Sequence, residues 1–211
     1  AAATLDAARA DYVSVLDADD FLLPGRFARL LAVPQADMIA DNILFVPETA
    51  TPGTLPPIPT VEPTVIPISL LDFVQANRSI KGAVRREWGF LKPVMRRAFL
   101  MDRGLRYQAD LRLGEDYDLY VRMLQAGARF RVLTEVGYAA RWRSDSLSSR
   151  HRTAALAALH LASQGHLSAP DLDDATRAAL LAHSDALRQR HLLRDFLDIR
   201  ARSGRTAALL A

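Results

Sequence analysis

The chain has 211 residues, half of them hydrophobic and 24% charged, which is typical of a soluble globular protein with one sizeable core or a core plus an appendage. It contains no Cys, which excludes disulfides, zinc–thiolate sites and thiol nucleophiles. All five His lie at position 151 or later, so a general base or metal ligand in the first 150 residues must be a carboxylate or, failing that, a Lys or Tyr.

The net charge of +3 conceals an asymmetry along the chain. Residues 1–75 carry a net charge of −7, residues 76–152 carry +9 and residues 153–211 carry +1. An acidic segment facing a basic one would suit a metal ion on one side and an anionic ligand on the other. Nucleic acid is not an expected partner, because the sequence has no basic helix with interleaved aromatic residues and no nucleic-acid-binding motif.

The first elements lead to a cluster of acids. Residues 1–10 are Ala-rich and predict part of a helix. Residues 12–16 predict a strand buried on both faces, followed at once by Asp17, Asp19 and Asp20. Open α/β sheets bind ligands at the carboxyl ends of strands, and Mg²⁺ commonly takes one or two carboxylates plus phosphate oxygens. The stretch therefore predicts a metal site for a phosphorylated ligand, with an acidic turn that caps the next helix as the alternative.

The later elements are those of an α/β core followed by an α-helical tail. Helices are predicted over 24–33, from 69, between Pro93 and Gly104, and over 115–126; strands are predicted over 37–46, 129–133 and 138–143. Residues 47–67 hold seven of the eleven Pro and predict a long irregular loop. From about residue 150 the sequence is rich in Ala, Leu and Arg and predicts helices, with a break at 165–170.

A second acidic pair, Glu115 and Asp116, follows Gly114 at the start of the predicted helix 115–126. Acids in a first helical turn also offset the helix dipole, contributing ~0.3–1 kcal/mol each, and this capping role is the alternative interpretation. Considered with the acidic stretch about a hundred residues earlier, one acidic cluster could hold a metal ion while the other supplies a base.

These motifs, in this order and spacing, resemble the family 2 glycosyltransferases of the GT-A fold, and bacterial exopolysaccharide enzymes of the succinoglycan type in particular. The resemblance covers about residues 1–150 and rests on Leu16-Asp17-Ala-Asp19-Asp20 with Leu23-Pro24-x-Arg26, on Gly114-Glu115-Asp116, and on Tyr138-x-x-Arg141 to Asp145-Ser-Leu-Ser148. It implies an α/β fold class, a GT-A-like (Rossmann-like) sandwich with a mixed sheet that lacks its first strands, plus a C-terminal α-helical tail. The domains expected from it are a partial GT-A domain at 1–149 and a helical extension at 150–211.

The resemblance implies inverting, metal-dependent transfer of a sugar from a nucleotide-sugar, with a UDP-sugar as the first candidate, to a saccharide or lipid-linked acceptor in polysaccharide biosynthesis. As in that family, Asp19 would bind Mn²⁺ or Mg²⁺ on the donor diphosphate, and Asp17 would contact the ribose or a metal-bound water. Asp116 would be the base that takes the proton of the acceptor hydroxyl, and Glu115 would position the acceptor. The implied location is the cytoplasm, or the cytoplasmic face of the inner membrane.

Two residues of the basic stretch 80–100, Trp88 and Lys92, are candidates for acceptor binding by stacking and hydrogen bonding, with ordinary packing as the alternative. In the family, the strands that carry the pocket for the nucleotide base precede the Asp-x-Asp strand, and this chain has no room for them. We therefore expect a fragment or a trimmed domain whose donor binding is impaired.

Two alternatives from other functional classes stay open. A non-catalytic fragment would fold and bind an acceptor or a partner without turnover. A phosphatase of the haloacid dehalogenase type would use Asp17 as nucleophile and Asp19 as acid/base, but Asp20-Phe21 and the absence of its later motifs argue against it. A calcium loop that begins at Asp17 is excluded, because its sixth and twelfth positions would be Leu22 and Ala28 instead of Gly and Glu.

Overall fold

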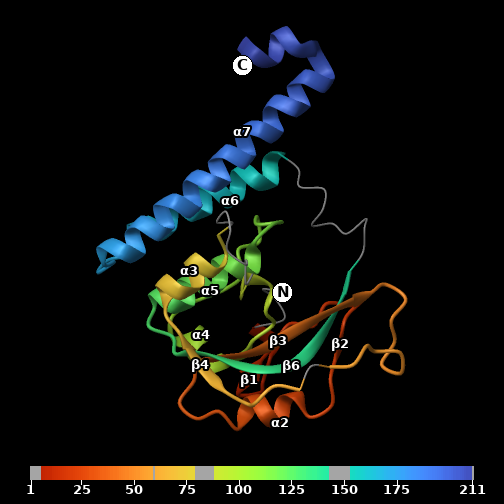
Figure 1. The fold of residues 1–211 in the computed structure, drawn as a ribbon. Coiled ribbons are helices and arrows are strands. Elements are labelled where there is room, and N and C mark those ends of the chain that lie inside the picture. The colour runs from red at the N-terminus through yellow and green to blue at the C-terminus, as the bar shows by residue number, and fades with distance from the viewer. Residues whose placement is uncertain (1–5, 59, 79–87, 143–152, 211) are drawn as a thin grey trace.

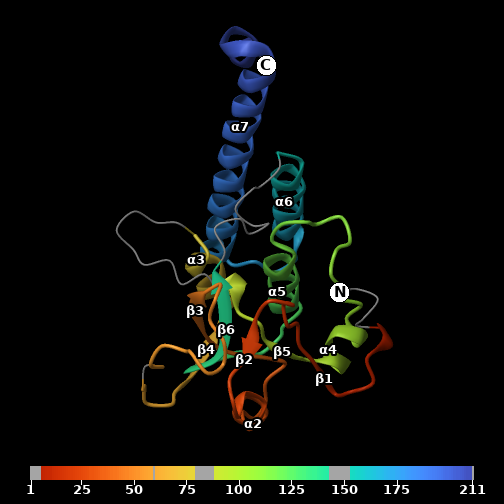
Figure 2. The same cartoon turned by 90° about the vertical axis from the view of Figure 1, so that its right-hand side faces the viewer.

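The computed structural model describes residues 6–58, 60–78, 88–142 and 153–210 (Figure 1). Within them, a mixed sheet lies between helices, and the two helices of the tail lie side by side above it (Figures 1 and 2). The strands are β1 Tyr12–Val13, β2 Phe21–Leu22, β3 Met38–Pro47, β4 Val65–Ile68, β5 Val94–Arg96 and β6 Phe130–Trp142. The helices are α2 Arg26–Leu31, α3 Leu70–Ala76, α4 Arg97–Asp102, α5 Glu115–Gln125, α6 Thr153–Gly165 and α7 Asp174–Leu210, with 3₁₀ turns η1 Trp88–Phe90 and η3 His166–Ser168.

The two longest strands, β3 and β6, run parallel at the centre of the sheet, whose order is β1-β5-β3-β6-β2. The other pairings are antiparallel. On its second edge, β6 pairs with β4 over residues 130–133 and with β2 at residues 138–139. The register of β3 against β6 shifts on either side of Asn42, between these two pairings. The pairing of β2 with residues 138–139 places the β1–β2 connection beside the carboxyl-terminal half of β6.

Both faces of the sheet are covered, because residues along β3 alternate between two cores. Met38 and Ala40 belong to the larger core, which includes residues of α3, α4 and α5. Ile39 belongs to a smaller core with Leu30 of α2 on the opposite face, where Leu30 is fully buried. Burial of one Leu side chain contributes roughly 1.5–3 kcal/mol, which is enough to hold a short helix such as α2 on the sheet.

The helical tail shares the larger core. The buried residues of α7 recur at helical spacing, and two of them, Ala179 and Leu180, belong to the same cluster as the sheet residues. Helix α7 contacts both α6 and α3, whereas its carboxyl-terminal part extends away from the sheet (Figures 1 and 2). It is interrupted at Gly204, whose φ of 84° is not helical. The tail is therefore packed on the α/β core through its first half.

The structure confirms the α/β class, the mixed sheet, the helical tail and most of the expected elements. The helix expected over 115–126 is α5, and Gly127 ends it with a φ of +85°. The cap expected at Ser69 is present, because Ser69 and Asp72 exchange side-chain and backbone hydrogen bonds. The break expected at 165–170 separates α6 from α7.

Several expected boundaries are wrong. The strand expected over 12–16 is only Tyr12–Val13, half-buried at the edge of the sheet. Its pairing with β5 is limited to Tyr12 opposite Arg96 and Val13 opposite Met95. The expected loop 47–67 ends in β4, and the two strands expected after 129 are one strand, β6.

The helix expected after Pro93 begins at Arg97, because Val94–Arg96 form β5. The helix expected over 1–10 falls partly outside the described residues, and residues 8–10 are not helical.

Candidate active site

The acids at 17–20 lie in a turn between β1 and β2. The turn is closed by the Asp20 amide, which donates to the Asp17 carbonyl at 3.1 Å. The Asp20 carboxylate accepts hydrogen bonds from the Tyr138 hydroxyl and the Arg141 amide, both at 2.8 Å. The Arg141 guanidinium donates to the Asp19 carbonyl at 2.7 Å. Asp20, Tyr138 and Arg141 therefore attach the turn to β6, which gives these motif residues a structural role.

The other two acids of the turn differ in their surroundings. The Asp17 side chain is 48% exposed, and its Oδ2 lies 3.2 Å from the Lys92 Nζ. The Asp19 side chain is half-buried, and its carboxylate makes no hydrogen bond or ion pair with any residue that the structure describes. Asp19 thus keeps its oxygens available to a ligand, whereas Asp17 already faces a cation.

Asp116 is held by two donors at the first turn of α5. The Lys92 Nζ donates to Asp116 Oδ2 at 2.6 Å, and the Tyr107 hydroxyl donates to Oδ1 at 2.9 Å. Burial alone would lower the pKa of Lys92, but the carboxylates of Asp116 and Asp17 outweigh it and raise that pKa. Burial and the neighbouring Asp116 also raise the pKa of Tyr107. Both groups therefore stay protonated and donate to Asp116.

Lys92 brings the two predicted acidic motifs together. Its side chain is 11% exposed and contacts Asp17 from the β1–β2 turn and Asp116 from α5. Sequence analysis proposed all three residues, but not this contact between them. Tyr107 was not proposed at all, because a single Tyr in an irregular segment gives no periodic or motif signal.

A hydrogen bond from Arg26 fixes the main chain at Lys92. The Arg26 Nε donates to both Asp41 oxygens, at 2.9 and 3.1 Å, and its Nη2 donates to the Lys92 carbonyl. Both side chains of this ion pair are 1% exposed. Burial raises the pKa of Asp41 in spite of the opposing charge of Arg26. The Tyr138 ring lies 5.3 Å from the guanidinium, so Arg26 contacts the supports of both acidic motifs.

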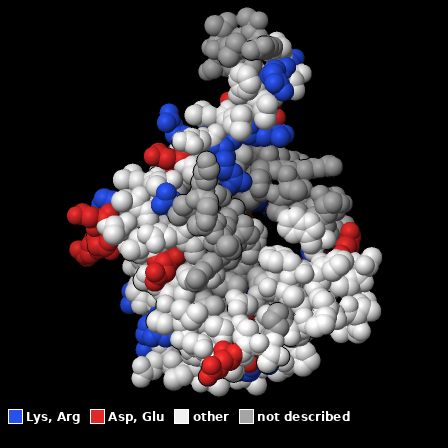
Figure 3. Space-filling model, in the orientation of Figure 1, with Lys and Arg blue, Asp and Glu red and all other residues white. Residues whose placement is uncertain are grey.

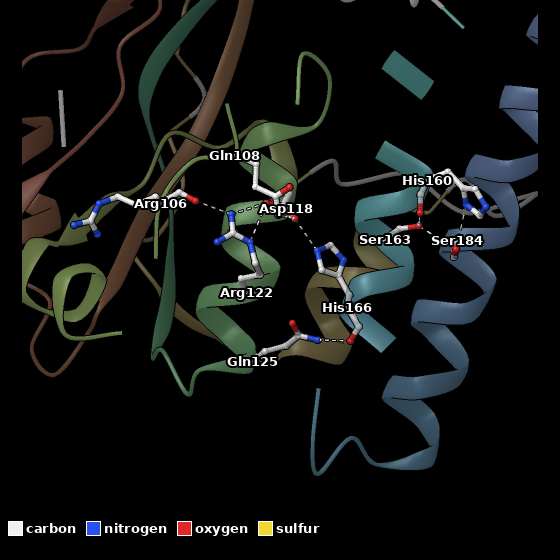
Figure 4. A network of polar contacts seen from close by, with 9 residues as sticks. All are labelled: Arg106, Gln108, Asp118, Arg122, Gln125, His160, Ser163, His166 and Ser184. Atoms are coloured by element: carbon white, nitrogen blue, oxygen red, sulfur yellow. Dashed lines mark hydrogen bonds and ion pairs between the residues drawn. The ribbon is translucent and has the colours of Figure 1, made fainter. Parts of the chain in front are cut away.

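The helix that carries Asp116 is fixed from the other side by the tail (Figure 4). Asp118 is fully buried and accepts hydrogen bonds from Arg122 and from His166 of η3, the latter with 2.9 Å between Nε2 and Oδ1. Burial opposes ionisation of Asp118, but His166 and Arg122 outweigh it and lower its pKa. Gln125 donates to the His166 carbonyl at 2.7 Å. The tail therefore holds α5 along its length.

The remaining predicted site residues are less central. Glu115 is half-buried at the first position of α5, beside Asp116. Trp88 is 8% exposed and belongs to the larger core, which fits the packing alternative. The acceptor-binding roles given to Glu115, Trp88 and Lys92 stay predictions.

The acids fit only one kind of metal site. No group of three or more His, Asp or Glu side chains converges anywhere in the part of the chain that the structure describes. A cage built from protein ligands alone is therefore not formed there. Asp19, with Asp17 beside it, fits a hard cation that takes its remaining ligands from phosphate oxygens and water.

These features define a class of protein: a GT-A-like α/β fold with carboxylates in the β1–β2 turn and at the start of α5. No protein-family model matches the chain. Over 192 residues it is 46% identical to the succinoglycan biosynthesis protein ExoU of Rhizobium meliloti (strain 1021), covering 91% of this chain and 56% of ExoU. Over 150 residues it is 31% identical to the succinoglycan biosynthesis protein ExoO of the same organism, covering 69% of this chain and 42% of ExoO. The chain thus spans about half the length of these curated relatives.

Solved structures give the same result for the fold. Crystal structures of S. aureus TarS 1-349 in complex with UDP-GlcNAc and with UDP match 95% of this chain, with TM-scores of 0.56 and 0.53 and sequence identities of 18% and 17%. The chain covers 53% and 51% of those two chains. The expected GT-A-like fold and the expected resemblance to proteins of succinoglycan biosynthesis are confirmed. No helix in the described ranges is long and apolar enough to cross a membrane.

Proposed function

We propose that the protein is a glycosyltransferase of exopolysaccharide biosynthesis that takes its sugar from a nucleotide-sugar. The observation that carries this proposal is the contact of Lys92 with both Asp17 and Asp116, which puts the two acidic motifs within one site. The relationship to the succinoglycan biosynthesis proteins supports the polysaccharide product. The UDP-GlcNAc and UDP bound by TarS support a nucleotide-sugar donor, with a UDP-sugar as the first candidate.

The donor side of the site is the β1–β2 turn. Asp19 would bind Mn²⁺ or Mg²⁺ together with the donor diphosphate, and Asp17 would assist from the same turn. A bound divalent cation supplies charge neutralisation to the diphosphate leaving group. Asp20, held by Tyr138 and Arg141, would keep the turn in place while Asp17 and Asp19 bind the metal ion and the diphosphate.

The acceptor side is Asp116. In an inverting transfer, the acceptor oxygen bonds to the anomeric carbon, the bond from that carbon to the diphosphate breaks, and the acceptor proton passes to a base. Tyr107 holds Asp116 Oδ1, so the acceptor hydroxyl would replace the Lys92 ammonium at Oδ2. Glu115 would bind the acceptor beside it. The acceptor would be a saccharide or a lipid-linked saccharide. With a lipid-linked acceptor, transfer would take place at the cytoplasmic face of the membrane.

The two sides of the site can be separated by mutation. Asp19→Ala should weaken binding of UDP with Mn²⁺ and reduce transfer. Asp116→Asn preserves shape and removes the proton acceptor, so UDP and Mn²⁺ should still bind while transfer falls by ~10²–10⁴-fold. Binding is measured by isothermal titration calorimetry, and transfer by release of UDP from UDP-GlcNAc and other UDP-sugars. Asp110→Asn, at an exposed carboxylate between β5 and α5, is the control and should change neither.

Three outcomes would contradict the proposal. Equal binding of UDP and Mn²⁺ by the wild type and Asp19→Ala would remove the donor site from the β1–β2 turn. Near wild-type transfer by Asp116→Asn would assign the base to another acid. A folded protein that binds no nucleoside diphosphate with or without Mn²⁺ would favour the non-catalytic alternative.

A further inference from the structure

The Lys92 ammonium is a buried cation shared by two carboxylates. It lies 2.6 Å from Asp116 Oδ2 and 3.2 Å from Asp17 Oδ2, with 11% of its side chain exposed. Asp116 is 15% exposed, so the contact between these two charges is largely shielded from solvent. Asp17 is the open end of the triad, because its side chain is 48% exposed.

The backbone around Lys92 leaves only its side chain free to respond to a ligand. Arg26 donates to the Lys92 carbonyl, and the Tyr120 hydroxyl donates to the Leu91 carbonyl at 3.1 Å. Pro93 follows directly and restricts the backbone of Lys92 itself. The flexible four-carbon stem of the lysine is therefore the part that can move the charge.

A metal ion at the β1–β2 turn would meet this charge. Asp17 would bind a divalent cation through Oδ2 less tightly while the Lys92 ammonium keeps its 3.2 Å contact, because the two cations would then stand within a few ångströms of each other and repel. The shielding of Lys92 from water increases this repulsion. Metal binding therefore requires the ammonium to give up Asp17, or it occurs at Asp19 with a weaker second ligand.

We infer that Lys92 is a built-in competitor of the divalent metal ion at Asp17, and that it keeps metal binding weak until a diphosphate arrives. The inference rests on the proposed function, since it concerns the metal of the same site. A diphosphate brings negative charge that attracts both cations, so with the donor bound the two no longer compete for Asp17 alone. The site would then load metal and donor together.

Lys92→Met removes the ammonium and keeps an unbranched apolar stem. It should tighten binding of Mn²⁺ alone by about tenfold or more, since one charge within 4–6 Å commonly changes proton affinity by ~10- to 1000-fold. With saturating UDP the gain should become much smaller or reverse. Lys92→Arg keeps the charge and should stay within about threefold of the wild type. Binding is followed by the electron paramagnetic resonance signal of free Mn²⁺, which does not depend on turnover.

Arg129→Met is the matched control, because it removes one positive charge from an exposed side chain that is paired with Asp37 far from the β1–β2 turn. It should leave Mn²⁺ affinity within about twofold of the wild type. Circular dichroism and thermal unfolding check that each variant is folded. If Lys92→Met does not fold, Lys92→Gln serves as the second neutral variant. Asp19→Ala establishes that the Mn²⁺ measured is bound at the turn.

Each outcome decides a different point. Tighter Mn²⁺ binding by Lys92→Met, lost on addition of UDP, supports the inference. Equal Mn²⁺ affinity of the wild type and Lys92→Met overturns the inference and leaves the proposed function standing. Absence of Mn²⁺ binding in both overturns the inference together with the metal dependence of the proposed function. Equal binding by the wild type and Asp19→Ala overturns the metal site itself.

Discussion

Gly137 of β6 should not tolerate any side chain, because its backbone lies against the buried ion pair of Arg26 and Asp41. A Cβ at this position would lie 1.7 Å from Asp41 Oδ2 and 2.9 Å from Arg26 Cγ. Neither partner has room to move, since both side chains are 1% exposed and Arg26 also donates to the Lys92 carbonyl. Gly137→Ala should therefore break the ion pair of Arg26 and Asp41. Loss of a buried ion pair lowers the free energy of unfolding by about 3–5 kcal/mol.

Such a loss is a large fraction of the ~5–15 kcal/mol by which a domain is usually stable. Urea unfolding followed by Trp fluorescence measures it. The control is Gly165→Ala, where the added Cβ meets no heavy atom within 4 Å and the φ of −59° is helical. It should change stability by no more than about 1 kcal/mol, and in the stabilising direction. If Gly137→Ala costs less than about 1 kcal/mol, the assignment of Arg26 as a rigid support of the site is wrong.

Two further predictions concern stability away from the site. Burial opposes ionisation of Asp37, but hydrogen bonds from Arg129 and Arg96 outweigh it and lower the pKa of Asp37 to about 2, from 3.8. The stability that the Asp37 carboxylate contributes should therefore be complete above about pH 4 and be lost as the pH falls toward 2. Urea unfolding measured across this pH range tests this, because Asp37→Asn should remove that loss of stability. Ser69→Ala removes the hydroxyl that accepts from the Asp72 amide and should cost about 1 kcal/mol in the same assay; an unchanged midpoint would show that the cap is not needed.

Sequence predicted the elements whose signals are local. Helix α5 could be predicted because Gly114 and Gly127 flank a periodic apolar face, and Ser69 could be predicted because its cap needs only the next three residues. The two-residue strand β1 could not, since it is defined by pairing with Met95 and Arg96 of β5, about eighty residues later in the chain. Local patterns carry no information about such a partner.

The same limit applies to the site. Asp17, Asp19 and Asp116 could be proposed because acids at these spacings match a motif. The role of Arg26 could not be predicted, although it was part of the motif quoted, because its partners Asp41 and Lys92 lie in separate parts of the chain. A buried Arg looks like any other Arg in a sequence, and only the fold shows that it lies at 2% exposure beneath the site.

The charge asymmetry of the chain corresponds in part to contacts inside the fold. Acidic residues of 1–75 do contact basic residues of 76–152, and the contacts named here are internal supports. Asp37 pairs with Arg96 and Arg129, and Asp20 and the Asp19 carbonyl are bound by Arg141. On the face shown in Figure 3, acidic and basic side chains are interspersed rather than separated into blocks.

The basic side chains that contact these acids, Arg96, Arg129 and Arg141, are therefore paired within the fold. They are not free to bind an anionic ligand. The contact of Lys92 with Asp17 and Asp116 differs from the pairs made by Asp37, because Asp17 is 48% exposed whereas Asp37 is 3% exposed. An ion pair with an exposed partner can be exchanged for a ligand at little cost in stability, whereas a fully buried pair such as Arg26 and Asp41 cannot. Under the proposed function, this difference in exposure assigns ligand exchange to Asp17 and Lys92 and support of the site to Arg26.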